Sequence, residues 1–209
     1  MQPSHFQVCS LFSSFRRQRR RSTSLFCIPR FMYILQFDGI YQRSIPEIPS
    51  LDGISGYGWL ITMKGVEIAH GFGLFAHRST ASSSMAEYLA LIEGLDALVD
   101  LRVETELIEV HGDAKCVIDQ MQGLSSVSSL SLRKLHRRAC KLERNFHSLS
   151  WCWVPRQKNR QADQLSRRGL RYLGSATLPL HSMGRAQSAI YPVVNLRVHT
   201  PASLTIQSR

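Results

Sequence analysis

Acidic residues are missing from both ends of the sequence: none occurs before Asp38 or after Asp163, although the chain has 15 of them. The same window contains 14 Lys and Arg residues and is nearly neutral, whereas 12 further basic residues lie outside it and account for the net charge of +11. A chain of 209 residues with 44% hydrophobic content can bury one good core but is short for two full domains. We therefore expect one nearly neutral globular domain between basic flanks.

Cysteines are few and irregularly spaced. The five residues Cys9, Cys27, Cys116, Cys140 and Cys152 are odd in number, and no two of them form a C-x-x-C pair. This pattern supports neither a disulfide framework nor a zinc knuckle, and it fits a reducing compartment. The sequence also lacks any apolar run near the roughly 20 residues that a membrane-spanning helix needs, so we expect a soluble intracellular protein with no membrane partner.

Residues 1–31 form a segment rich in Arg and Ser that lacks the apolar stretch of a secretory signal. Three interpretations remain open: an organelle transit peptide, a basic arm whose "RRQRRR" binds nucleic acid, or translated sequence upstream of a true start at Met32. A start at Met32 suits a cytoplasmic protein, and a genuine arm suits an organelle or the nucleus. Residues 174–209 show no sustained period, so we interpret them as a disordered tail, which leaves 32–173 as the domain.

Between these flanks, strand-like and helix-like patterns alternate. Three β-prone runs come first, at 31–37, 56–63 and 66–76, and a Lys64-Gly65 turn joins the last two, which predicts an antiparallel meander. A helix around Glu87, a strand at 105–112 and a helix opening at "DAKCVIDQM" follow. Next come a helix near 128–145, a strand at 148–155 and a final helix through 159–170. This order predicts a mixed sheet with helices packed on it.

Glu87 occupies an unusual place in the helix "MAEYLALIEGL". At about 100° per residue, Tyr88, Leu91, Ile92 and Leu95 fall on one apolar face, and Glu87 lies at its edge. An ionised carboxylate at the rim of a packed face loses hydration and needs a cation, a hydrogen-bond donor or a metal ion as partner. The alternative is a surface glutamate near a helix N-terminus, where the helix dipole favours negative charge.

Three aspartates are candidates for the same site as Glu87. Asp38 and Asp113 are placed where strands are expected to stop, and strand ends on one edge of a sheet can converge in space. Asp163 lies among the helix-forming residues of "NRQADQLS". Each has an ordinary alternative, because aspartate is common in turns at strand ends and in the first turn of a helix.

Five motifs, taken in order, resemble the type 1 ribonuclease H family over about residues 32–173. They are "FDG" at 37–39, "GYG" at 56–58, "MAEYLALIEGL", "VHGDAKCVIDQMQG" at 110–123 and "WVPRQKNRQADQLS" at 153–166. The resemblance implies an α/β fold with a five-stranded mixed sheet, three antiparallel strands first, flanked by helices. It also implies hydrolysis of the RNA strand of an RNA–DNA hybrid, with the family's acidic positions at Asp38, Glu87, Asp113 and Asp163.

The implied chemistry explains why acids are needed. Attack of water on a phosphodiester develops negative charge on the attacking and leaving oxygens, and two Mg²⁺ or Mn²⁺ ions about 3.5 to 4 Å apart can stabilise both. Such hard cations prefer oxygen ligands. In this hypothesis the four carboxylates are both the catalytic and the metal-binding residues.

The sequence departs from the family pattern around the substrate. The loop at 39–55 is longer than expected, and Ser83 and Ser84 stand where many members have asparagines that read the RNA strand. The loop "PRQKNRQ" has no histidine to help product leave, so Arg156, Lys158 or Asn159 is the candidate replacement. No basic hybrid-binding handle occurs around 123–130, so the chain resembles a compact, monomeric form.

Another basic surface is therefore expected to bind the substrate. A stripe of cations follows one side of the helix after Ser131, opposite the apolar positions of that helix, and its candidate phosphate contacts are Arg133, Arg137 and Lys141. A merely solvated helix face is the alternative. At the level of the whole chain, two other functions compete with the nuclease: an inactive nucleic-acid-binding module of retroelement origin, and a 3′ exonuclease, which Ile40 disfavours because that chemistry usually has an acid there.

Overall fold

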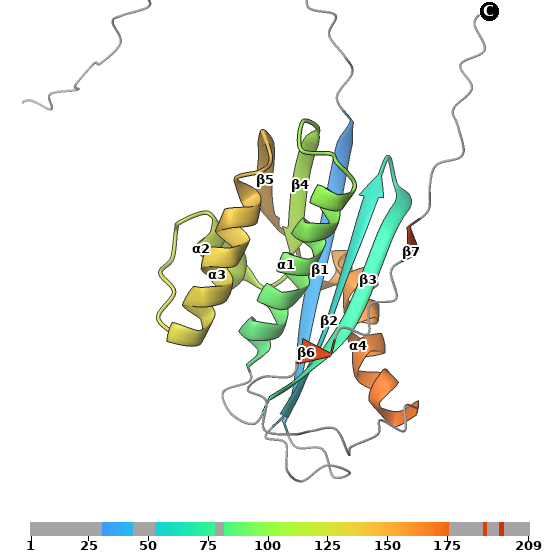
Figure 1. Ribbon diagram of the computed structural model, residues 1–209, viewed down its shortest axis with the longest axis vertical. Helices are drawn as coiled ribbons and strands as arrows, with labels where there is room; N and C mark the ends of the chain where they lie inside the picture. Colours follow the sequence, from blue (N-terminus) through green and yellow to red (C-terminus); the bar gives the residue numbers. More distant parts are fainter. Residues whose placement is uncertain (1–30, 44–52, 78–81, 176–189, 192–196, 199–209) are drawn as a thin grey trace, which may run out of the picture.

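The computed structural model describes residues 31–43, 53–77, 82–175, 190–191 and 197–198. A mixed sheet runs through the molecule in the order β5-β4-β1-β2-β3-β6, where β6 is Ile190–Tyr191, and β7 (Arg197–Val198) also pairs with β3 (Figure 1). The five main strands are β1 (Met32–Arg43), β2 (Gly53–Met63), β3 (Val66–His77), β4 (Leu107–Gly112) and β5 (Ser148–Trp153). The pairs β1–β2 and β2–β3 are antiparallel, whereas β1–β4 and β4–β5 are parallel. The fold class expected from the sequence is confirmed.

Helices cover both faces of the sheet. On one face, α1 (Ser83–Asp100) packs on β1 and β2, and α3 (Leu130–Glu143) packs on α1, with the short α2 (Lys115–Met121) beside them (Figure 1). On the other face, α4 (Arg160–Ser175) lies over β1, β2 and β3 after the short 3₁₀ turn η1 (Arg156–Lys158). Gly56 and Gly58 of β2 face α4, where a Cβ atom would collide with the backbone of Ser166.

Successive side chains along each strand point to opposite faces of the sheet. Leu35 and Phe37 of β1 are fully buried under α1, together with the apolar face that the sequence predicted for this helix. The Ser82 hydroxyl caps α1 by accepting a hydrogen bond from the Met85 N–H. Lys64 and Gly65 both have positive φ in the tight turn between β2 and β3, as the hairpin prediction requires.

The first strand differs from the expectation in a way that matters for the site. Asp38 was expected where a strand stops, but β1 continues through it to Arg43, and Asp38 pairs with Gly58. The loop is correspondingly shorter than the predicted 39–55, because β2 begins at Gly53. The physical reason is that the glycines opposite this half of β1 let the antiparallel ladder continue directly beneath α4.

The flanks are described only in small part. The arm at residues 1–30 and most of the segment after α4 lie outside the described residues, so the interpretations of both remain predictions. Two short strands that the sequence did not predict, β6 (Ile190–Tyr191) and β7 (Arg197–Val198), pair with β3. Among the helices that the structure describes, none has the length and apolarity needed to cross a membrane.

Candidate active site

Three carboxylates from separate elements meet beside the sheet. Asp38 and Asp113 each directly follow one of the paired residues Phe37 and Gly112, so Asp38 within β1 and Asp113 just past the end of β4 occupy equivalent positions. Glu87 reaches them from α1, and ligand oxygens of the three side chains lie within 4.8 Å of one another. The structure thus brings together three of the four carboxylates that the sequence singled out.

Glycine at position 39 allows the helix to come this close. A Cβ atom on Gly39 would collide with the backbone nitrogen of Glu87, so any side chain there would push α1 away from β1. The Gly39 backbone N–H donates a hydrogen bond to the Glu87 carboxylate. The other oxygen, Oε2, is buried without a hydrogen-bond partner among the described residues. Such an oxygen is free to bind a cation.

The electrostatics of the cluster favour a positively charged partner. Burial, reinforced by the neighbouring Asp113 and Asp163 and opposed by a hydrogen bond from Ser166, raises the pKa of Asp38 to about 6. Burial and the nearby charges of Asp38 and Asp113 hold the pKa of Glu87 well above its usual range. A bound cation would relieve this repulsion, and three carboxylates offer only oxygen ligands, which suit a hard divalent ion.

Asn159 contacts this cluster from inside the protein. Its side chain is fully buried, and its amide nitrogen lies 2.8 Å from both Asp113 Oδ1 and the carbonyl oxygen of Phe37. The expectation that Asn159 contacts substrate does not fit this position, because its donor is already used inside the protein. A role in orienting the Asp113 carboxylate fits better.

Ser166 is a support that the sequence analysis missed. Its hydroxyl is buried in α4, donates to Asp38 Oδ2, and lies 2.9 Å from the carbonyl oxygen of Asp163. The available signal was its position three residues after Asp163, which places both on one side of a helix. Without the tertiary contact to Asp38, this spacing does not distinguish Ser166 from any helical serine.

Asp163 lies outside the group of three. Its carboxylate is held by Arg156 Nη2 at 2.5 Å and by Arg167 Nε at 2.9 Å. Burial alone would raise the pKa of Asp163, but hydrogen bonds from Arg167 and Arg156 outweigh it and lower the pKa. Arg156, a predicted substrate contact, is therefore bonded to Asp163 while its side chain stays 62% exposed.

The other predicted substrate contacts lie on two helices, at the start of α1 and along α3. Ser83 and Ser84 form the first turn of α1, one turn before Glu87. All the basic residues of the α3 stripe, Arg133, Arg137 and Lys141 among them, are exposed, whereas Ala139 on the opposite side is buried against α1. Contact with a nucleic acid remains a prediction for these residues.

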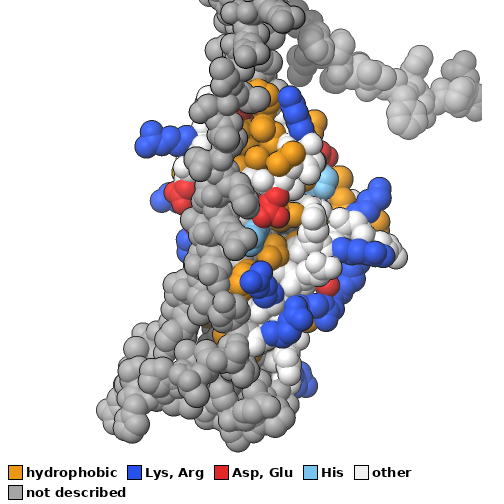
Figure 2. All heavy atoms as spheres, turned by 90° about the vertical axis from the view of Figure 1, so that its right-hand side faces the viewer, with side chains coloured by type: hydrophobic (Ala, Val, Ile, Leu, Met, Phe, Trp, Pro, Cys, Tyr) orange, Lys and Arg blue, Asp and Glu red, His pale blue; other side chains and the backbone are white. Residues whose placement is uncertain are grey.

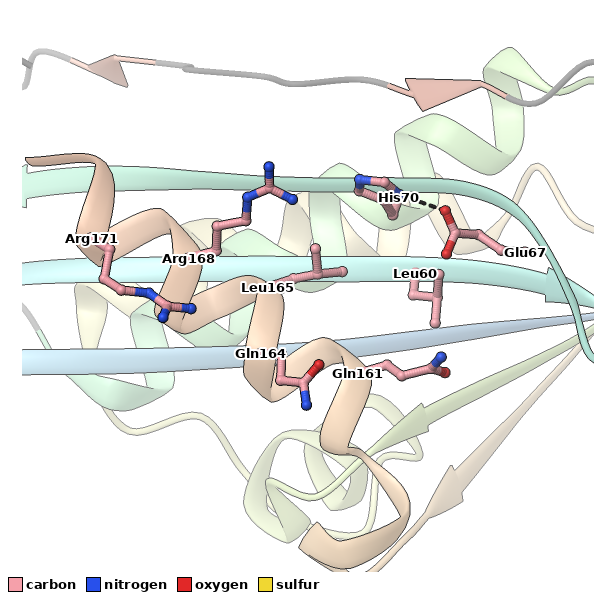
Figure 3. Close-up of a pocket in the computed structure, with 8 residues that line it drawn as sticks. All are labelled: Leu60, Glu67, His70, Gln161, Gln164, Leu165, Arg168 and Arg171. Atoms are coloured by element: carbon pink, nitrogen blue, oxygen red, sulfur yellow. Dashed lines mark hydrogen bonds and ion pairs between the residues drawn. The ribbon is translucent and has the colours of Figure 1, made fainter. Parts of the chain in front are cut away.

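The face that carries α4 is also basic. Figure 2 shows many Lys and Arg side chains on this side of the molecule. A hollow of about 370 Å³ lies between α4 and the sheet, and Figure 3 shows Arg168 and Arg171 on one side of it and the bonded pair His70 and Glu67 on the other. The guanidinium of Arg168 lies 4.8 Å from the centre of the Phe72 ring. None of the four carboxylates lines this hollow.

Comparison with known proteins agrees with the fold and with the motifs. A family model described as reverse transcriptase-like matches residues 48–169, a range that includes Glu87, Asp113 and Asp163 and begins after Asp38. The chain is 37% identical to the "Bifunctional protein Rv2228c" of Mycobacterium tuberculosis over 86 residues, or 41% of this chain and 23% of that protein. It is 33% identical to a "Ribonuclease HI" of Halobacterium salinarum over 119 residues, or 56% of this chain and 57% of that protein.

A solved structure extends this likeness to three dimensions. The N-terminal RNase H domain of rv2228c from Mycobacterium tuberculosis, fused with maltose-binding protein, matches with a TM-score of 0.59 and 27% identity. The match covers 71% of this chain and 99% of that one. The present chain therefore spans about a quarter to just over half of the length of the curated relatives, but nearly all of the solved domain.

Proposed function

The chain belongs to the ribonuclease H-like family that the reverse transcriptase-like model describes, and from this premise we propose that it is a metal-dependent endoribonuclease that hydrolyses the RNA strand of RNA–DNA hybrids. One observation carries the proposal: Asp38, Glu87 and Asp113 place ligand oxygens within 4.8 Å of one another, on the fold of a domain named for RNase H. The curated name "Ribonuclease HI" of a relative supports the same activity.

Asp38, Glu87 and Asp113 would hold Mg²⁺ or Mn²⁺, and the unpartnered Oε2 of Glu87 is a ready ligand. When bound, two such ions supply positive charge that stabilises the attacking and leaving oxygens of an in-line displacement on phosphorus. Asp163 is the proposed fourth carboxylate, at the margin of the cluster, where Arg156 and Arg167 keep it ionised.

Neighbouring side chains set the geometry of these ligands. Asn159 fixes the orientation of the Asp113 carboxylate through its amide, and Ser166 does the same for Asp38 through its hydroxyl. The exposed Arg156 can approach a substrate phosphate from beside Asp163. Ser83 and Ser84 are the proposed contacts to the RNA strand, and the α3 stripe is the proposed contact to more distant phosphates.

Cleavage of a hybrid with a labelled RNA strand tests the proposal. The wild-type protein should cut the RNA strand only with Mg²⁺ or Mn²⁺ and leave the DNA strand whole. The single changes D38N, E87Q and D113N should each lower kcat by at least about 100-fold while hybrid binding survives, because they remove ligand charge and leave the surface intact. D163N should lower kcat by a smaller factor, because Asp163 lies outside the group of three.

The exposed Asp100 at the end of α1 provides a matched control, and D100N should leave cleavage unchanged. Tight hybrid binding by wild-type protein with no metal-dependent cleavage would instead identify an inactive binding module. Persistent cleavage in both D38N and D113N would show that the catalytic site is elsewhere.

A further inference from the structure

A second group of possible metal ligands lies on the strands that neighbour the carboxylate cluster. Glu109 and His111 of β4 and Cys152 of β5 place their ligand atoms within 4.8 Å of one another. The group shares no residue with the carboxylate cluster, and its chemistry differs, since it combines a carboxylate oxygen, an imidazole nitrogen and a thiol sulfur. From this geometry we propose that Glu109, His111 and Cys152 form a site for a thiophilic divalent ion of the Zn²⁺ class.

Strand register builds the group. His111 pairs directly with Cys152 across the parallel β4–β5 ladder, so their side chains leave the sheet side by side on the same face. Glu109 lies two residues earlier on β4 and shares that face. Ile108 and Val110, which alternate with Glu109 and His111 along β4, are buried in the core on the other face, and this holds the strand in its rotation.

One edge of the group already fits a tetrahedral ion. Ligand atoms about 2.0 to 2.3 Å from Zn²⁺ lie about 3.3 to 3.8 Å from one another in a tetrahedron. Nε2 of His111 lies 3.3 Å from Oε1 of Glu109, so this edge is already close to the required length. The Cys152 sulfur lies within 4.8 Å of both other ligand atoms, and a water molecule can take the fourth position.

The imidazole is poorly satisfied without a metal. The Nε2 atom of His111 is buried and has no geometrically good hydrogen-bond partner among the described residues, even though the side chain as a whole is 18% exposed. Among the described residues, the Cys152 sulfur makes a weak contact with the carbonyl oxygen of Trp153 at 3.6 Å. Neither group would have to give up a strong bond within the protein in order to bind an ion.

Ligand type separates the two sites. Nitrogen and sulfur ligands select borderline and soft ions, whereas the three carboxylates suit Mg²⁺ or Mn²⁺. His111 lies two residues before Asp113, or about 7 Å along the strand, so the proposed ion would bind beside the carboxylate cluster without using its ligands. The proposal does not depend on hybrid hydrolysis.

Titration of the full-length protein with Co²⁺ in excess Mg²⁺ tests the site, because a thiolate ligand produces a near-ultraviolet charge-transfer band and a carboxylate does not. We expect one equivalent of Co²⁺ to give this band in wild-type protein and in C116S, whose cysteine is exposed on α2. The band should disappear in C152S. A band that survives in C152S, or no band in wild-type protein, would overturn the proposal.

Zn²⁺ affinity, measured by competition with a chromophoric chelator, provides a second readout. Changes to groups that only orient ligands weaken metal sites by about 10- to 100-fold, so loss of a ligand in H111Q or C152S should cost at least about 100-fold. A third measurement needs no variant: Zn²⁺ should protect Cys152 of wild-type protein from alkylation and leave Cys116 reactive. Equal alkylation of the two cysteines with and without Zn²⁺ would refute the site.

Discussion

Replacing Asp38 with asparagine should stabilise the metal-free protein at neutral pH, although it removes a proposed catalytic group. The Asp38 side chain is only 3% exposed, and burial and two neighbouring aspartates raise its pKa from 3.8 to about 6. Asparagine has nearly the same shape, carries no charge and can still accept the hydrogen bond from Ser166. The change therefore removes a cost of folding while leaving the packing in place.

The size of the effect follows from the pKa. A rise from 3.8 to about 6 costs the folded state about 3 kcal/mol at pH 7, since each tenfold change in proton affinity is worth about 1.4 kcal/mol. Because the folded pKa is the higher one, the folded protein keeps this proton between pH 3.8 and 6 while the unfolded chain releases it. The advantage of D38N that comes from the titration of Asp38 should thus be near zero at pH 4 and grow up to about pH 6. It should not shrink above pH 6, because loss of the Asp38 charge also favours ionisation of Glu87.

Chemical and thermal unfolding in a chelator, from pH 4 to 8, measure this difference. At pH 7, D38N should melt about 6 to 12 °C above the wild type. D100N, which removes an exposed carboxylate from the end of α1, should change stability by less than about 0.5 kcal/mol at every pH. Mg²⁺ should then stabilise the wild type much more than D38N. A D38N protein that is no more stable than wild type at pH 7, or whose advantage does not shrink toward pH 4, would refute the reasoning.

Three further predictions concern the surroundings of the cluster. N159A should raise the Mg²⁺ concentration needed for cleavage by about 10- to 100-fold and leave the KM for the hybrid nearly unchanged, because the amide orients Asp113 and does not face the substrate. A change in KM alone would instead indicate that Asn159 binds substrate. If the α3 stripe binds phosphates, the triple variant R133Q, R137Q, K141Q should flatten the slope of log Kd against log salt by about one for each phosphate that it no longer neutralises. An unchanged slope would show that the stripe is only a solvated helix face. A chain that starts at Met32 should have nearly the same Tm as the full-length chain and cleave hybrids equally well, because β1 begins there. If this shorter chain fails to fold, residues 1–31 are part of the domain.

Local pattern was sufficient for the order and type of the main elements. Three features depend on residues only a few positions apart and so can be predicted from the sequence alone: the apolar face around Leu91, the hairpin at Lys64 and the alternating strands. The C-terminal limit of β1 could not be predicted in this way, because the second half of the strand is held extended by its pairing with β2 under α4. The backbone pairing of β6 and β7 with β3 has no local pattern that would have identified it.

The sequence by itself also determined which residue types the candidate site has, since Asp38, Glu87 and Asp113 stand out as acids at element boundaries or at the rim of an apolar face. Only the tertiary structure decided what supports them: Asn159 bonds Asp113 across 46 positions, and Ser166 bonds Asp38 across 128. The same holds for Cys152, whose spacing excludes a zinc knuckle but which parallel register sets beside His111. Spacing rules detect ligands that are close along the chain, whereas a sheet brings ligands together by strand order and register, which long-range pairing decides.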